Sequence, residues 1–143
     1  MMARTAAKVR DAVAPDGSDV RVLVGCDRAS MAHFELAPHQ TSVAVAHRTL
    51  DELWYFLRGR GEMWRRSERT GDEETVAVHA GVALTIPSHT SFQFRSTSDE
   101  PLTAVGVTVP AWPGIGDMDG TGEATIVEGP WRPTVTSGLP ADR

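Results

Sequence analysis

The sequence has little of several features that would assign a protein to a particular class. It contains one cysteine, Cys26, so no disulfide can form within the chain. No apolar run approaches the roughly 20 residues that a membrane span needs, and residues 1–13 lack the apolar stretch of a secretory signal. The formal net charge of -5 argues against a nucleic-acid partner, because a nucleic-acid-binding surface has to be basic. These absences predict a cytoplasmic protein that binds neither membranes nor nucleic acid.

What the sequence does contain is a series of short segments with the pattern of β-strands. Every second residue from 20 to 24 is valine, which is the period of two expected for a strand. Further strand-like segments, separated by glycine, proline and polar residues, are 31–36, 42–47, 53–57, 62–66, 75–78, 82–86, 91–95 and 102–109. The alanine-rich sequence of residues 2–13 predicts one short helix. Many short strands at fairly regular spacing are typical of a sandwich or a small barrel, so we expect an all-β protein.

The length of 143 residues suits a single domain. Turn-forming residues at 15–17 and a shift toward proline and glycine after residue 110 divide the chain into three parts. We expect a short N-terminal segment over residues 1–18, a barrel over residues 19–110, and a loop-rich C-terminal tail over residues 111–143. Trp131 is expected to anchor the tail on the outside of the barrel, and the end from about residue 136 is expected to be frayed.

Two spacings carry the most information. His47 is followed after four residues by Glu52 and after six more by Gly59, and Gly81 is followed after five residues by Pro87. In order and separation they resemble the paired motifs of the cupin superfamily, and in particular the small single-domain cupins of the cupin-2 type. The resemblance covers about residues 19–110 and implies a double-stranded β-helix, which is the cupin or jelly-roll barrel.

The resemblance also bears on a metal site, because cupin metalloenzymes hold Fe, Mn, Ni, Zn or Cu with three histidines and one glutamate. Only His47 and Glu52 match that set, since Val45 and Phe92 stand at two of the histidine positions. Valine and phenylalanine have no lone pair for a metal, so we expect no metal cofactor. The alternative is a divalent transition metal on His47 and Glu52, completed by a histidine outside the pattern, and His33 is the candidate.

Two further departures concern glycine. His39 stands where the family pattern opens its first motif with glycine, and His89 stands at the glycine that follows the proline of the second motif. Both histidines fall in predicted turns beside a proline. We therefore interpret them as surface residues rather than as ligands.

The side chains on one face of the predicted strands define a pocket wall. Side chains alternate along a strand, so the residues two apart from His47 and from Glu52 share a face with them. The family places this face toward the inside of the barrel. The expected wall is Val45, His47, Glu52, Trp54, Phe56, Phe92 and Phe94. Two ionisable groups in an aromatic and aliphatic surround are typical of a small-molecule site.

Three functions remain open at this point. In the first, the pocket binds a small molecule and His47 and Glu52 act as a metal-free acid–base pair. In the second, the chain is a metal-dependent cupin enzyme, an oxygenase or an isomerase, that uses His47, Glu52 and His33. In the third, it is a ligand-sensing or dimerisation module without chemistry. The sequence does not decide whether the protein is an enzyme.

The segment 53–57 predicts an oligomer. Leu53, Tyr55 and Leu57 alternate with the expected pocket residues, so both faces of this strand are apolar and both are expected to be buried. Cupin barrels commonly pair through such a strand, which implies a homodimer. Cys26 has no base near it in the sequence, and we expect a buried thiol there.

Overall fold

The protein is described here from a computed structural model, which covers residues 1–113 and 123–139. The described residues form eleven β-strands and no helix, and all pairings are antiparallel. One sheet has six strands in the order β1 (Ala12–Val13), β2 (Asp19–Cys26), β3 (Ala29–Leu36), β10 (Leu102–Val109), β5 (Asp51–Arg58) and β8 (Ala83–Ile86). The other has five in the order β11 (Ala124–Ile126), β4 (Val45–His47), β9 (Thr90–Ser96), β6 (Arg60–Ser67) and β7 (Glu73–His79).

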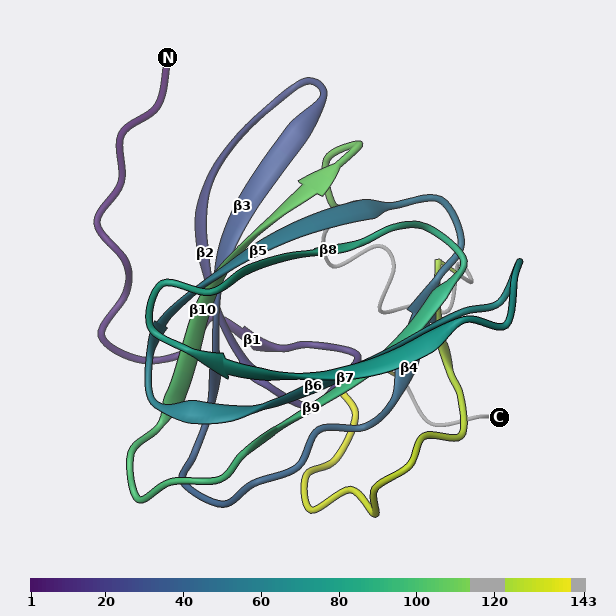
Figure 1. Ribbon diagram of the computed structural model, residues 1–143. Helices are drawn as coiled ribbons and strands as arrows, with labels where there is room; N and C mark the ends of the chain where they lie inside the picture. The colour runs from purple at the N-terminus through teal and green to yellow at the C-terminus, as the bar shows by residue number, and fades with distance from the viewer. Residues whose placement is uncertain (114–122, 140–143) are drawn as a thin grey trace.

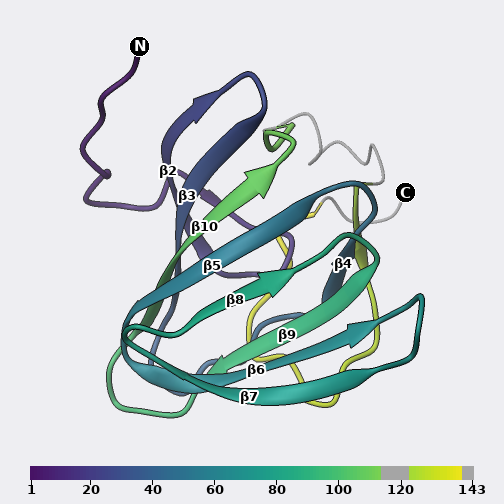
Figure 2. The same ribbon diagram turned by 45° about the horizontal axis from the view of Figure 1, so that its top comes forward.

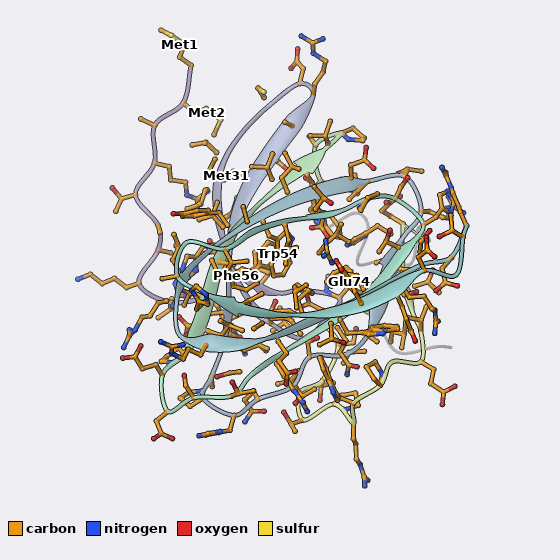
Figure 3. All side chains as sticks on the ribbon, in the orientation of Figure 1. Met1, Met2, Met31, Trp54, Phe56 and Glu74 are labelled. Carbon is orange, nitrogen blue, oxygen red and sulfur yellow. The ribbon has the colours of Figure 1, made fainter. Side chains whose placement is uncertain are left out.

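The two sheets face each other and enclose the core, as Figure 1 and Figure 2 show from two directions. The inward residues are large and apolar, and Trp54 and Phe56 project between the sheets in Figure 3. The largest of the fully buried side chains are Trp54, Phe56, Phe92, Phe94 and Leu36. Burial of this much apolar surface is the main force that holds the two sheets together. The expected all-β architecture, with short antiparallel strands in two facing sheets, is confirmed.

Strand β5 shows the alternation that the sequence predicts. Glu52, Trp54 and Phe56 are buried, whereas Leu53 and Tyr55 are 53% and 51% exposed. The expectation that both faces of this strand are buried is therefore wrong for the single chain. The strand pairs with β10 on one side and β8 on the other, and its outer side chains are exposed in the part of the chain that the structure describes.

The N-terminal residues do not form the expected helix. Residues 1–7 are irregular, and Ala12–Val13 instead adds a short strand beside β2. The Arg21 guanidinium donates to the backbone carbonyl of Ala7 at 3.0 Å and so ties the segment to β2. A helix of about 12 residues is marginal on its own, and this one would have had little apolar surface to bury against the sheets.

The tail that follows β10 packs on the outside of the five-stranded sheet, with residues 123–139 described. Trp131 exchanges two hydrogen bonds with the buried side chain of Gln93, and the Arg95 guanidinium lies 4.1 Å from its ring centre. Near the expected frayed end, Gly138 donates its backbone N–H to the carbonyl of Ala14 at 2.8 Å. Residues 114–122 and 140–143 of the expected tail lie outside the described residues.

The two histidines at glycine positions keep the backbone shape that glycine usually supplies. His39 has φ of 61° and His89 has φ of 59°, both in the left-handed region. His89 also donates its backbone N–H to the carbonyl of His47 at 2.9 Å, which holds the turn after β8 against the end of β4. A non-glycine residue adopts this left-handed conformation at a conformational cost.

Candidate functional site

A cavity of about 450 Å³ lies against the inner face of the six-stranded sheet. Its wall comes from β2, β3, β5 and β10, from β4 and β9 of the other sheet, and from the N-terminal segment. Most of the lining is apolar. The ionisable and hydroxyl side chains in the described lining are Arg4, Asp16, Ser30, His47, Glu52 and Thr108, together with the thiol of Cys26. The size and the lining are those of a small-molecule site.

The structure brings five of the seven expected wall residues to this cavity, namely Val45, His47, Glu52, Trp54 and Phe92. Phe56 and Phe94 are fully buried but do not line it. Their rings lie 5.9 Å and 5.1 Å from the Trp54 ring and support it from below. Cys26 is exposed at the edge of the cavity, so the expected buried thiol is wrong.

An aromatic pair forms one side of the cavity. The rings of Phe34 and Trp54 stack with their centres 4.8 Å apart and their planes 3° from parallel. Gly106 of β10 lies opposite Trp54 in the register. A Cβ at this glycine would lie 2.7 Å from the Phe34 ring and 3.1 Å from Trp54 Nε1. The stacked pair and the space beside the indole nitrogen therefore both depend on a glycine at this position.

His47 lies between two carboxyl groups. Its Nε2 is 3.6 Å from Glu52 Oε2, and its Nδ1 is 4.0 Å from Glu123 Oε1. The side chains of all three residues are less than a tenth exposed. Trp112 meets the imidazole with its edge at 5.3 Å between ring centres. The imidazole is thus held at a buried site with one carboxyl group facing each nitrogen.

Glu123 is held by the loop that follows β4. The backbone N–H groups of Thr49 and Leu50 donate to its Oε1 at 2.9 and 3.0 Å, and the Thr49 hydroxyl donates to its Oε2. Burial alone would raise the pKa of Glu123. These hydrogen bonds and the neighbouring His47 outweigh burial and lower the pKa, so Glu123 is ionised at neutral pH.

Glu52 has the opposite protonation state. Burial is the main reason that its pKa rises from the ordinary 4.5 to about 8, and the nearby carboxyl groups of Asp16 and Glu123 add to the rise. The Trp54 indole N–H, a donor near the carboxyl group that does not reach hydrogen-bond geometry, lowers the pKa and is outweighed. At neutral pH Glu52 is therefore a neutral acid that can donate a proton, beside an imidazole whose other neighbour is an anion.

Asp16 is a third carboxyl group at the cavity, and it comes from the N-terminal segment. It is 3% exposed, and burial raises its pKa although the Ser18 hydroxyl and backbone N–H both donate to it. Neither Asp16 nor Glu123 was expected from the sequence. Asp16 lies in a turn and Glu123 in a glycine-rich segment, and no spacing relates either residue to His47.

Two polar atoms in the wall lack a hydrogen-bond partner among the described residues. They are Oε2 of Glu52 and Nε1 of Trp54. Both side chains are at least 97% buried. Buried polar atoms in native proteins are hydrogen-bonded, and at a cavity wall the partner is water or a bound ligand.

The donors present do not fit a cupin metal site. Val45 and Phe92 lie directly opposite each other in the β4–β9 register, so the two apolar replacements sit together at the cavity. Glu52 and Glu123 approach opposite nitrogens of His47, so one ion cannot contact both carboxylates and the ring. In residues 1–113 and 123–139 no group of three His, Cys, Asp or Glu side chains could hold a metal.

His33 does not complete such a set. It is adjacent to Phe34, whose ring stacks on Trp54 inside the barrel, so the side chain of His33 projects from the opposite face of β3. In the register of the sheet, the backbone of His33 lies opposite Arg21 of β2 and Val105 of β10. Burial and the Arg21 charge lower the pKa of His33. The structure therefore separates His33 from His47 and Glu52 by the thickness of the sheet.

Solved structures share this fold at low sequence identity. The capsular polysaccharide assembling protein CapF from Staphylococcus aureus aligns with a TM-score of 0.66 and 15% identity over 79% of this chain and 32% of its own. Oxalate decarboxylase from Bacillus subtilis aligns with a TM-score of 0.61 and 17% identity over 72% of this chain and 28% of its own. The chain thus spans about a third or less of these two proteins.

A third structure is similar in length as well. It is a conserved protein from Klebsiella pneumoniae with a double-stranded β-helix domain, and it aligns with a TM-score of 0.60 and 15% identity over 85% of this chain and 91% of its own. A search of curated proteins found no significant match. No helix that could span a membrane occurs in the part of the chain that the structure describes. The family model for the cupin domain matches residues 32–108, which is more than half of the sequence, and the chain therefore belongs to the cupin domain family.

Proposed function

We propose that the barrel cavity binds a small, largely apolar molecule and that His47 transfers a proton to or from it without a metal. The observation that carries this proposal is the position of the imidazole in the cavity wall, between an acid that is neutral and one that is ionised. Pairs of acids whose pKa values are driven apart by their surroundings are characteristic of acid–base sites. Similar folds under 25% identity indicate no reaction by themselves.

Each residue has a distinct role in the proposal. The anionic Glu123 beside Nδ1 favours the tautomer with a proton on that nitrogen and orients the ring. Nε2 is then left to accept a proton from the bound molecule. Glu52 faces the same Nε2 and, as a neutral acid, returns a proton to the molecule or stabilises charge that develops on it. Glu123 acts through His47 and is a positioning residue.

A generic proton-abstraction reaction tests this assignment without knowledge of the natural substrate. The probe is 5-nitrobenzisoxazole, a flat apolar molecule from which a base removes the ring C–H proton. The electron pair of that bond forms the nitrile, the N–O bond breaks, and the product is a coloured cyanophenolate. We expect saturable turnover by the protein, because the cavity holds the probe beside His47.

The variant His47→Asn should lower this rate by about 100-fold or more, the usual contribution of a general base. His79→Asn, an exposed histidine on β7, is the matched control and should leave the rate unchanged. Unchanged turnover in His47→Asn would contradict the proposed role. Binding of the probe without any turnover would favour a ligand-sensing module instead.

We also propose that two copies of the chain pair through the outer face of β5. Leu53, Tyr55 and Leu57 are 53%, 51% and 43% exposed there. Large apolar side chains in a row on an exposed sheet face are typical of a protein–protein contact. A homodimer that buries this face would also account for the apolar character of both sides of the strand.

A reducing compartment such as the cytoplasm fits the single thiol. Cys26 is exposed and unpaired among the described residues, and exposed thiols are rare in proteins of oxidising compartments.

A further inference from the structure

The two unpartnered atoms of the cavity wall lie on the same strand face. Glu52 and Trp54 are two residues apart on β5, so their side chains are neighbours that point inward. The indole N–H acts on the Glu52 carboxyl group as a hydrogen-bond donor and lowers its pKa, which places the two groups close together, but the two do not meet in hydrogen-bond geometry. Neither Oε2 of Glu52 nor Nε1 of Trp54 has a hydrogen-bond partner among the described residues.

The chemistry of these atoms limits what can bind between them. An indole N–H donates a hydrogen bond and cannot accept one. A neutral carboxyl group donates through its O–H, and burial keeps Glu52 in that form at neutral pH. If both groups donate to one atom, that atom needs two lone pairs, and a carbonyl oxygen is the simplest such group. The same arrangement would stabilise an enolate oxygen if a proton were removed beside the carbonyl.

Glycine at residue 106 keeps a side chain away from the indole nitrogen. A Cβ at Gly106 would lie 3.1 Å from Trp54 Nε1, in the wall of the cavity. With only hydrogen there, the space beside the indole nitrogen stays open to a ligand.

The rest of the cavity favours a ligand without charge. The carboxyl groups of Asp16 and Glu52 are both held toward their neutral forms by burial, which indicates a site that opposes charge. Arg4 is the one cationic side chain of the described lining, and it pairs with Asp11 at 3.6 Å. The stacked rings of Phe34 and Trp54 offer a flat apolar surface next to the donors.

We propose that the natural ligand is an uncharged, largely apolar carbonyl compound whose oxygen binds between the Trp54 indole N–H and the Glu52 carboxyl group. The inference rests on the proposed function and names the chemical class of its substrate. His47 lies 3.6 Å from Glu52 and so stands beside the bound carbonyl. Its Nε2 takes a proton from the carbon next to the carbonyl, the electron pair of that C–H bond forms a C=C bond, the π pair of the carbonyl moves to the oxygen, and Glu52 gives its proton to that oxygen to form the enol.

The test compares two probes of nearly equal shape. They are 2-acetylnaphthalene, which carries the carbonyl, and 2-isopropenylnaphthalene, in which a CH₂ group replaces the oxygen. Affinities are measured by calorimetry for the wild-type protein and for Trp54→Phe, which keeps an aromatic ring and removes the N–H. We expect the variant to bind the ketone roughly three- to tenfold more weakly, as for the loss of one hydrogen bond, and the alkene with little change.

A second measurement does not depend on a variant that folds. The C=O stretch of carbonyl-labelled 2-acetylnaphthalene is recorded by infrared spectroscopy when the probe is bound to the wild-type protein. A frequency at or below the value in water supports two donors on the oxygen. A frequency near the value in hexane overturns the inference, as does an equal loss of affinity for both probes in Trp54→Phe.

The outcomes also separate the inference from the proposed function. If both probes bind and the carbonyl frequency is that in hexane, the apolar cavity stands and the carbonyl site is wrong. If neither probe binds to the wild-type protein, the small-molecule cavity itself is wrong and both proposals are overturned.

Discussion

Replacing Glu52 with glutamine should change how the stability of the protein depends on pH. The pKa of Glu52 rises from 4.5 to about 8 on folding, chiefly because the carboxyl group is buried. Between these two values the unfolded chain ionises at residue 52 and the folded chain does not. The free energy of unfolding therefore falls as the pH rises, by about 1.4 kcal/mol for each pH unit.

The magnitude follows from the width of this interval. The contribution of a neutral Glu52 to the free energy of unfolding is fully present below pH 4.5. It falls between pH 4.5 and about pH 8 and is constant above that. At pH 7 the wild-type protein has lost roughly 3 kcal/mol relative to acidic pH from this residue alone. Glutamine has nearly the same shape and never ionises. Glu52→Gln should thus be more stable than the wild type at pH 7 by an amount of this order.

The assay is urea unfolding of both proteins at half-unit steps from pH 4.5 to pH 8.5. The difference between the two free energies of unfolding isolates residue 52, because the other titrating groups are common to both chains. Glu128→Gln, at an exposed glutamate, is the matched control and should run parallel to the wild type. A difference between Glu52→Gln and wild type that does not change with pH would refute a neutral Glu52.

Other predictions concern residues around the site and on the surface. Glu123→Ala should destabilise the protein by about 3 kcal/mol, because it leaves the backbone N–H groups of Thr49 and Leu50 without their acceptor. Glu123→Gln should lose less stability, and thermal unfolding distinguishes the two variants. Because φ is 59° at His89, His89→Gly should be neutral or stabilising by up to about 1 kcal/mol, and His89→Val should be destabilising. A stabilising valine would argue against this backbone conformation. Untagged protein should carry well under one equivalent of transition metal by mass spectrometry, and EDTA should not lower its Tm; one equivalent of bound metal would show that ligands were missed. Leu53→Asp should shift the protein from dimer to monomer in sedimentation equilibrium, and a monomeric wild type at micromolar concentration would contradict the β5 contact.

The fold could be predicted because local sequence patterns largely determine it. The alternation of Glu52, Trp54 and Phe56 with exposed residues fixes which face of β5 is inside, and the structure has that face buried. The spacing of His47, Glu52 and Gly59 identified the family, whose model matches residues 32–108. Local alternation and turn residues suffice for this because a strand has only two faces.

The predictions that proved wrong concern residues whose tertiary contacts override their local structural preference. The N-terminal residues look helical in isolation, but backbone pairing with β2 and the hydrogen bond from Arg21 to Ala7 hold them extended. Cys26 was expected to be buried as a small apolar residue, but it ends β2 at the open edge of the cavity. Burial at strand ends depends on which neighbours cover them, and a local pattern does not contain that information.

The electrostatics of the site could not be predicted for the same reason. Glu123 reaches the loop at Thr49 from 74 residues away. Asp16 belongs to the N-terminal part of the chain, and its charge contributes to the raised pKa of Glu52. The pair His47 and Glu52 was visible in the sequence, but the protonation state of Glu52 depends on these two distant carboxyl groups and on the depth of burial.

The most direct test of the account is the protonation state of Glu52, because both the proton transfer and the carbonyl site depend on a neutral acid there. Protein labelled with ¹³C at the glutamate side-chain carboxyl carbon is titrated by NMR, and the Glu52 signal is assigned by its absence in Glu52→Gln. The account predicts a signal in the protonated position at pH 6 that moves to the ionised position with a midpoint near pH 8. A signal that is already in the ionised position at pH 6 would contradict the account.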